Sequence, residues 1–190
     1  MRGLPGSPKP DKKRRQALPH EQGGSGGDRS PRGNRDRDAS GRARNARPRD
    51  ALGRPLPRSD TDSAAPRIAD DLVLPATEAV ELAERLLRDD QPFHAHEVLE
   101  MLWKTGPAAE RDLWQGLAQI AVGITHARRG NAQGAITLLR RGSDRVRGYS
   151  GQAHGIAVTR VLAAVDDLAA RIDRDGLAVV PDADLLLPLT

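Results

Sequence analysis

The chain changes character near residue 70, and this change limits what it can fold into more than any other feature. Residues 1–66 contain 9 of the 14 prolines, 9 of the 19 glycines and no aromatic residue. Leu is the only large aliphatic side chain found repeatedly there. A segment of this composition cannot bury enough apolar surface to offset its conformational entropy, so we expect residues 1–66 to be a disordered tail.

The charges divide at the same place. Residues 1–66 carry 16 Lys and Arg against 8 Asp and Glu, whereas residues 67–190 carry 14 against 18. The formal net charge of +4 therefore combines a basic tail with a mildly acidic remainder. A nucleic-acid interaction driven by positive charge is an expectation for the tail alone.

From residue 75 onward the apolar residues recur with a period near 3.6, which is typical of amphipathic helices. Pro92 suits a first helical turn, and Asp90 and Asn131 suit N-caps. We expect Gly142 and Gly148 to loosen the end of the fourth helix. The pattern predicts five helices, at about residues 75–88, 92–104, 108–129, 132–147 and 152–173.

The first two predicted helices resemble the next two at an offset of 40 residues. Ala95 and Leu99 correspond to Ala135 and Leu139, and small residues followed by Leu allow two helices to pack closely. The pattern is similar to that of tetratricopeptide repeats, although the period of those repeats is about 34 residues. We expect an all-α fold, a compact bundle of about five helices built from two similar helical hairpins plus a C-terminal helix.

The sequence thus predicts three parts, a tail (1–66), a helical domain (67–176) and an apolar C-terminal segment (177–190). Pro181 and Pro188 interrupt the last segment, so we expect it to be extended. It should lie over the helices or over a second copy of the chain, because an exposed apolar segment would be adhesive.

Several classes of protein are disfavoured. The chain has no cysteine, which excludes disulfides and thiolate metal sites. No apolar stretch follows the basic run at Arg14 and Arg15 as a secretory signal would require. No window reaches the roughly 18 apolar residues of a membrane span. We expect a cytoplasmic protein with no membrane partner.

Three segments carry a family resemblance. They are FHAHEVLEMLWK (93–104), LWQGLAQIAVGITHARRGN (113–131) and GAITLLRRG (134–142). Together and in this order they resemble the domain-of-unknown-function family numbered 309, over roughly residues 72–147. Members of that family are small, all-helical and mostly bacterial proteins. The resemblance implies a compact helical domain and no particular reaction.

Polar side chains on the second and third predicted helices are candidates for a site inside the bundle. His96 and Glu100 are one turn apart on the edge of the apolar face of their helix. The third helix is apolar enough to be central, and a polar stripe on a buried helix needs partners. We predict a polar pocket formed by His96, Glu100, Trp103, Gln115, Gln119 and His126, with Trp103 as a wall.

Two interpretations of this pocket remain open. In one, His96, Glu100 and His126 bind a divalent metal, which would activate a water molecule for hydrolysis. In the other, Glu100 orients His96, and His126 bonds a backbone carbonyl between helices. The structural interpretation is preferred, because metal sites in helical bundles usually contain more carboxylates.

Residues 41–58 contain a cluster of arginines close together in the sequence, namely Arg42, Arg44, Arg47 and Arg49. Clusters of like charge such as this one are more commonly solvated linkers. The alternative is a docking element for RNA phosphate or for the acidic face of the chain's own domain. The absence of nearby aromatic residues disfavours RNA, because none can stack on bases.

The preferred hypothesis is a helical interaction or small-ligand-binding module with no assigned reaction, and not an enzyme. One alternative is a metal-dependent hydrolase using His96, Glu100 and His126. Another is RNA association through the Arg-rich tail. A protein partner, a small ligand and a second copy of the chain are candidate binding partners, and a divalent metal is the only candidate cofactor.

Overall fold

The structure is a computed structural model that describes residues 47–60, 64–65, 68–69 and 72–190. The chain divides into two compact units, Met1–Asn45 and Ala46–Thr190, and all described residues belong to the second. Most of the tail predicted to be disordered, together with Arg42 and Arg44, lies outside the described residues.

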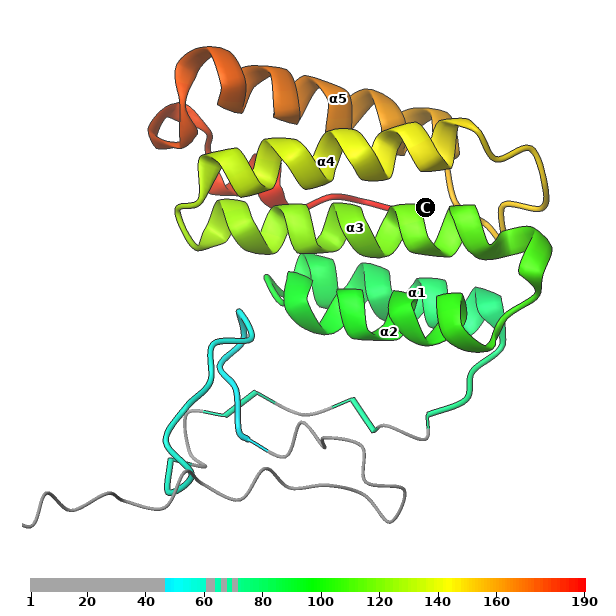
Figure 1. The fold of residues 1–190 in the computed structure, drawn as a ribbon, viewed down its shortest axis with the longest axis horizontal. Coiled ribbons are helices and arrows are strands. Elements are labelled where there is room, and N and C mark those ends of the chain that lie inside the picture. Colours follow the sequence, from blue (N-terminus) through cyan, green and yellow to red (C-terminus); the bar gives the residue numbers. More distant parts are fainter. Residues whose placement is uncertain (1–46, 61–63, 66–67, 70–71) are drawn as a thin grey trace, which may run out of the picture. The chain divides into compact units, whose positions relative to one another are not determined.

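Five α-helices make up most of the described chain, as predicted (Figure 1). They are α1 (Ala76–Arg88), α2 (Pro92–Thr105), α3 (Arg111–Arg128), α4 (Ala132–Arg147) and α5 (Val158–Asp175). Three short 3-10 helices are η1 (Ala108–Glu110), η2 (Leu177–Val179) and η3 (Asp182–Leu185). Within the described residues there is no β-strand, apart from an isolated antiparallel bridge between Arg49 and Pro55.

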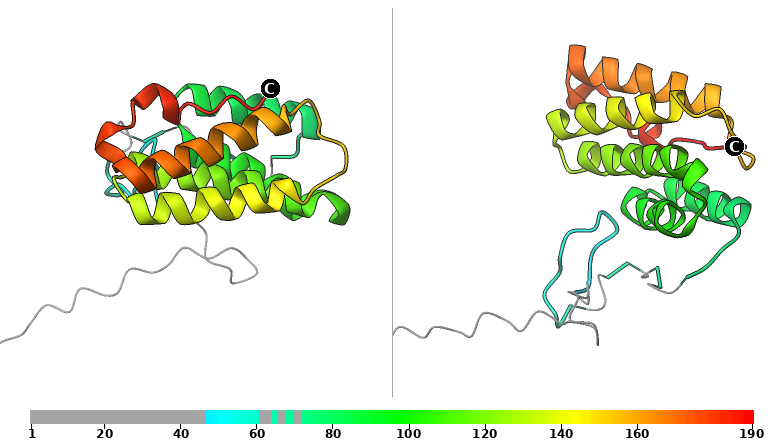
Figure 2. Two further views of the ribbon diagram at one scale, coloured as in Figure 1. Left: turned by 90° about the horizontal axis from the view of Figure 1, so that it is seen from above. Right: turned by 45° about the vertical axis from the view of Figure 1, so that its right-hand side comes forward.

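Each helix packs against the next one in sequence, so α1–α2 and α3–α4 form two hairpins joined by the α2–α3 contact, and α5 covers α4 (Figures 1 and 2). The all-α bundle predicted from the sequence is therefore confirmed. Its core is continuous from α1 to the C-terminal segment. The largest fully buried side chains include Trp114, Leu99, Leu113, Leu117, Ile120, Ile124, Leu139, Ile172 and Leu189.

The helix boundaries agree with the sequence prediction except at the N-cap of α2 and at the start of α5. Asn131 caps α4 as predicted, because its side chain accepts a hydrogen bond of 2.9 Å from the Gly134 N–H. Asp90 is not a cap. Gln91 directly precedes α2, and Asp90 has a left-handed backbone (φ 57°) and an ion pair of 2.6 Å with Arg128.

The start of α5 lies later than predicted. The sequence pattern placed it at about residue 152, whereas the helix begins at Val158. His154 (φ 52°) and Gly155 (φ 86°) both have left-handed backbones, which a right-handed helix does not allow. Periodicity missed this loop because its buried Ile156 continues the apolar stripe of the helix.

Glycines bring α3 and α4 unusually close together. A Cβ atom on Gly142 would lie 2.6 Å from the carbonyl oxygen of Gly116, and one on Gly116 would lie 2.8 Å from the carbonyl oxygen of Gly142. A Cβ on Gly123 would lie 2.9 Å from Cγ of Leu139. Gly142, which the sequence analysis expected to loosen α4, lies inside the helix and permits this close approach to α3.

The C-terminal segment belongs to the same core as the helices. Leu185, Leu187 and Leu189 are all buried. The Leu189 carbonyl accepts a hydrogen bond of 2.8 Å from the Ala157 N–H, and the Thr190 hydroxyl donates to the Glu84 carboxylate of α1. Figure 2 shows the segment running back along the helices. Of the two predicted locations, the structure shows the one over the helices, with η2 and η3 interrupting the extended backbone.

We expect Gly142→Ala to lower the free energy of unfolding by about 1–3 kcal/mol, because the new methyl group meets backbone that cannot move aside cheaply. Gly148→Ala, at the C-cap of the same helix, is the matched control, since its Cβ would meet nothing closer than 3.5 Å. Chemical denaturation of the full chain measures both changes. Equal stability of Gly142→Ala and the wild type would contradict the close contact.

We expect Leu189→Ala to lower the free energy of unfolding by about 2–5 kcal/mol, because it empties a buried site. Pro188→Ala, at the exposed neighbouring position, should change it by less than about 1 kcal/mol. Thermal unfolding followed by circular dichroism distinguishes the two. Similar losses in both variants would show that Leu189 is not part of the core.

Candidate functional site

His96 and Glu100 lie together on α2, as the sequence predicts. Their closest side-chain atoms, Nε2 and Oε2, are 4.0 Å apart, and Glu100 also pairs with Lys104 at 3.0 Å. The rings of His96 and Phe93 have centroids 5.7 Å apart. The buried Nδ1 of His96 has no hydrogen-bond partner among the described residues.

Burial lowers the pKa of His96 from its ordinary value of 6.5, and the negative charges of Glu100 and Glu97 offset only part of this effect. Desolvation acts in this direction because it penalises the charged imidazolium. His96 is therefore held in its neutral form more strongly than a solvated histidine.

His126, in the predicted polar stripe of α3, interacts with the start of α4. Nδ1 of His126 accepts a hydrogen bond of 2.8 Å from the Asn131 side chain, and a Cβ on Gly134 of α4 would lie 2.5 Å from the same atom. Among the described residues, no group of three His, Asp or Glu side chains could hold a metal ion. The predicted metal site at His96, Glu100 and His126 therefore has no support in the geometry.

The remaining predicted pocket residues lie on α2 and α3 and are partly buried. Gln115 and Gln119 are half-buried on α3, and the buried Oε1 of Gln119 has no hydrogen-bond partner among the described residues. Trp103 is partly buried and packs against the core from α2. Within the predicted stripe, His126 lies against Gly134 of α4.

Contacts between α3 and α4 establish their register. Cβ of Arg145 lies beside Gly116, and Gly134 lies beside His126. In this antiparallel pair, each step forward on α3 corresponds to a step back on α4. Arg141 is therefore level with Gln119, on the side of α4 that borders the polar stripe.

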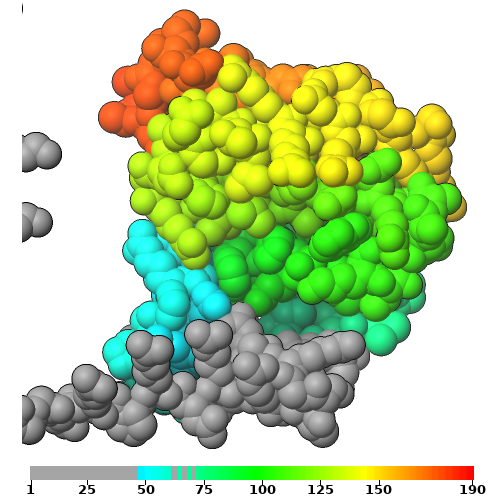
Figure 3. All heavy atoms as spheres, in the orientation of Figure 1, coloured from blue at the N-terminus to red at the C-terminus, as the bar shows by residue number. Residues whose placement is uncertain are grey.

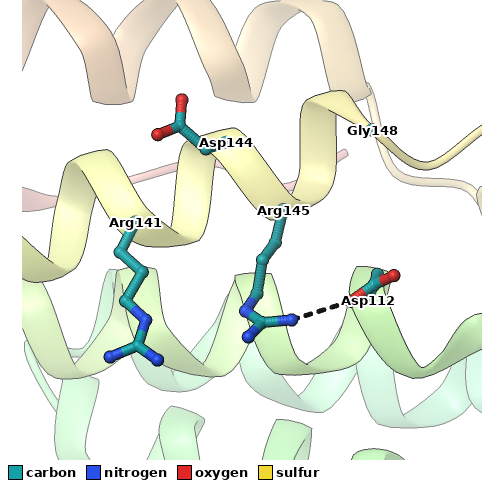
Figure 4. Close-up of a pocket in the computed structure, with 5 residues that line it drawn as sticks. All are labelled: Asp112, Arg141, Asp144, Arg145 and Gly148. Carbon is teal, nitrogen blue, oxygen red and sulfur yellow. Dashed lines mark hydrogen bonds and ion pairs between the residues drawn. The ribbon is translucent and has the colours of Figure 1, made fainter.

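An open pocket of about 540 Å³ lies at this border (Figure 4). Its lining residues are Asp112, Arg141, Asp144, Arg145 and Gly148. In Figure 4 the side chains of Arg141 and Arg145 extend from α4 toward α3, whereas Asp144 points the other way. The pocket is therefore bordered by two guanidinium groups and one carboxylate, that of Asp112.

The charged lining residues of this pocket are two arginines and two aspartates, whose formal charges cancel. Arg145 pairs with Asp112 at 2.8 Å, and Asp144 pairs with Arg147 at 2.8 Å. Arg141 has no ion-pair or hydrogen-bond partner within the described part of the chain. Arg147 also pairs with Asp166 of α5 at 2.5 Å, so Asp144 shares its arginine with a second carboxylate.

A neighbouring cluster was not foreseen from the sequence. Glu110 accepts a hydrogen bond of 2.9 Å from the Trp114 indole, and its other oxygen lies 3.1 Å from Nε2 of His154. Burial raises the pKa of Tyr149, and the negative charge of Glu110 adds to the shift. The cluster was missed because His154 was assigned to a helix, although Gly151 and Gly155 beside it indicate a loop.

This cluster borders a second open pocket of about 470 Å³, which shares Asp112 and Gly148 with the first. Its interactions hold the loop between α4 and α5 against the start of α3. We therefore interpret the cluster as the support for this end of the bundle.

Residues 47–60, which the sequence assigned to the disordered tail, form a defined loop, here called the N-terminal hairpin. Arg47 donates a hydrogen bond of 3.1 Å to the Leu56 carbonyl, and Arg49 donates one of 2.6 Å to the Gly53 carbonyl. Asp50 accepts hydrogen bonds from the backbone N–H groups of the turn. Two arginines of the predicted docking element therefore stabilise the hairpin itself.

The N-terminal hairpin contacts the helical domain at Phe93 and Arg129. Nε of Arg129 donates a hydrogen bond of 3.0 Å to the Leu52 carbonyl, and its Nη2 donates to the same oxygen. A Cβ atom on Gly53 would lie only 2.3 Å from the ring of Phe93. The guanidinium of Arg49 lies 5.4 Å from the centroid of that ring, within cation–π range. Figure 3 shows the hairpin in cyan against the helices.

Comparison with known families agrees with the resemblance. Residues 80–138 match the model of the family described as "Domain of unknown function (DUF309)", which confirms the resemblance over that range and carries no assigned reaction. The match includes Phe93 and Arg129, whereas Arg141 and the N-terminal hairpin lie outside it. Comparisons with the curated proteins and with the solved structures gave no match. None of the described helices combines the length and apolar character needed to cross a membrane.

The lowered pKa of His96 predicts a pH dependence of stability. Below pH 6.5 the unfolded state protonates this side chain before the folded state does, so stability falls as the pH decreases from 6.5 toward the lower folded pKa. We expect the Tm difference between pH 7.5 and pH 5 to be smaller in His96→Gln than in the wild type. An equal Tm difference in both proteins would contradict the assignment of this pH dependence to His96.

Proposed function

We propose that this domain is a non-catalytic binding module for short segments of protein, with a docking surface formed by Phe93 of α2 and Arg129 at the end of α3. The observation that carries the proposal is the N-terminal hairpin, a segment of the same chain that contacts both residues. The surface therefore accepts a short peptide loop in cis.

The contacts are of a kind that a partner segment could reproduce. Arg129 binds a backbone carbonyl, which every residue supplies, so this contact gives affinity without reading a side chain. The ring of Phe93 accepts a residue without a side chain, because any Cβ at Gly53 would overlap it. Gly53 also has φ 75°, which favours glycine. Together these contacts select a turn with glycine at its tip.

The other functions considered from the sequence are less well supported. A metal-dependent hydrolase would need a ligand group that the described residues do not form. For RNA association, Arg47 and Arg49 already donate hydrogen bonds within the hairpin. The proposed module is also consistent with a family to which no reaction is assigned.

We expect Arg129→Ala and Gly53→Val to release the N-terminal hairpin, because one removes its hydrogen bonds and the other places a side chain against Phe93. Amide hydrogen exchange at residues 50–56 should become at least about tenfold faster in either variant. Arg111→Ala, which removes an exposed arginine from the start of α3, is the matched control and should leave the exchange unchanged. Exchange that is already unprotected in the wild type would contradict docking.

The same variants allow a test in trans. A synthetic peptide of residues 46–60 should bind the Gly53→Val chain, whose surface is vacated, and shift the NMR signals of Phe93 and Arg129. A dissociation constant of about 1 mM for the free peptide is sufficient for docking in cis, because a tethered segment acts at a millimolar effective concentration. The absence of saturable binding, or unchanged binding after Arg129→Ala is added, would reject the proposed function.

A further inference from the structure

We propose that the docking surface of Phe93 and Arg129 recognises the sequence pattern Arg-Asp-x-x-Gly, and that residues 37–41 form a second segment of the chain that binds there. This inference rests on the proposed function and adds the sequence class of the partner. It is carried by the contacts of the N-terminal hairpin and by a repeat in the sequence.

Arg49, the first residue of the pattern, closes the turn and faces the docking surface at the same time. Its Nη1 donates a hydrogen bond of 2.6 Å to the Gly53 carbonyl. Its guanidinium also lies 5.4 Å from the centroid of the Phe93 ring. A planar guanidinium stacks on an aromatic face while it donates hydrogen bonds at its edge, whereas the ammonium group of lysine is a compact point charge. A partner segment therefore needs arginine at this position.

Asp50, the second residue, stabilises the shape of the turn. Its Oδ1 accepts hydrogen bonds from the backbone N–H groups of Leu52 at 3.0 Å and Arg54 at 2.7 Å. Asp side chains commonly stabilise turns by bonding their own backbone in this way. The backbone carbonyl of Asp50 also accepts a hydrogen bond of 2.8 Å from the Gly53 N–H. The turn that these bonds hold carries the Leu52 carbonyl to which Arg129 donates.

Gly53, the last residue of the pattern, is required by its backbone and by its neighbour. Its φ of 75° favours glycine, and a Cβ atom would overlap the Phe93 ring. The two positions between Asp50 and Gly53 are less restricted. Ala51 is exposed, and Leu52 is bound through its backbone carbonyl, which any residue supplies. The contacts therefore define the pattern Arg-Asp-x-x-Gly.

The same pattern occurs a second time in the chain, twelve residues earlier. Residues 49–54 are RDALGR and residues 37–42 are RDASGR, so the two segments differ at one position of six. That position is Leu52 in the hairpin and Ser40 in the earlier segment, where the docking surface binds the backbone carbonyl. Residues 37–42 lie outside the described residues.

The residues that the docking surface requires are therefore all present in the earlier segment. Arg37, Asp38 and Gly41 correspond to the arginine, the aspartate and the glycine whose contacts the hairpin shows. Because a turn of this kind is stabilised by its own side chain and backbone, the same sequence can form the same turn. Residues 37–41 are thus an alternative occupant of the docking surface.

The test uses the full chain carrying Gly41→Val and Gly53→Val, so that neither segment of the chain itself competes with an added peptide. The probes are two acetylated, amidated peptides of equal length, residues 46–60 and residues 34–48, in which the pattern occupies the same positions. A third peptide contains residues 34–48 in scrambled order. The NMR signals of the Phe93 amide and the Arg129 Nε–H report binding at the docking surface.

We expect the 46–60 and 34–48 peptides to shift both signals saturably, with dissociation constants within about tenfold of each other, since the turn contacts are shared. Gly41→Val within the 34–48 peptide should weaken its binding at least about tenfold, because it places a side chain against Phe93.

Two further changes in the 34–48 peptide separate the turn from its exposed part. Asp38→Ala should also weaken binding, because the turn loses the side-chain acceptor that Asp50 supplies in the hairpin. Ala39→Ser is the matched control and should leave binding unchanged, because the corresponding Ala51 is exposed.

Other outcomes reject the inference in distinguishable ways. Binding of the 46–60 peptide without binding of the 34–48 peptide would reject the second segment and leave the proposed function standing. Equal binding of the 34–48 peptide and its scrambled form, or of the peptide with and without Gly41→Val, would show attraction by charge and reject the pattern. No binding of either the 46–60 or the 34–48 peptide would reject the proposed function, and the inference with it.

Discussion

The close contact between α3 and α4 at Gly116 and Gly142 is the constraint on which the rest of the structure depends. Because neither glycine has a side chain, each backbone carbonyl approaches the opposite helix directly. The contact fixes the antiparallel register of the hairpin, and this register places Gly134 beside His126 and Arg145 beside Asp112. The composition of the candidate pocket follows from it, since four of its five lining residues belong to these two helices and the fifth, Gly148, directly follows α4.

A second set of contacts holds the end of α3 where the N-terminal hairpin docks. Arg128 pairs with Asp90 at 2.6 Å and with Asp182 at 2.7 Å, and its side chain is only 10% exposed. It thereby connects the α1–α2 turn, the end of α3 and the C-terminal segment. Arg129, the next residue, binds the hairpin from a position fixed on three sides.

The helices could be predicted from the sequence because their signals are local. Apolar periodicity identifies all five, and Asn131 caps α4 through its own neighbouring residues. The α3–α4 contact could not be recognised, because a glycine that weakens a helix and one that permits close packing look the same in a sequence. The packing role of Gly142 was missed for this reason.

The site was predicted less completely because it depends on which helices are neighbours. A helical wheel places Gln119 and His126 on one face of α3, but it cannot show that α4 borders that face. The N-terminal hairpin was missed because it contains little apolar surface. Its stability comes from hydrogen bonds of Arg47, Arg49 and Asp50 to its own backbone, which composition does not reveal.

The central claim is that the N-terminal hairpin occupies the surface of Phe93 and Arg129. The chain contains no cysteine, so Ala51→Cys, at an exposed position beside the turn, can carry a single nitroxide label on the full-length protein. Paramagnetic broadening of amide signals then measures where the label lies. Docking predicts strong broadening confined to the start of α2 and the end of α3, whereas weak broadening spread evenly over all five helices would contradict it.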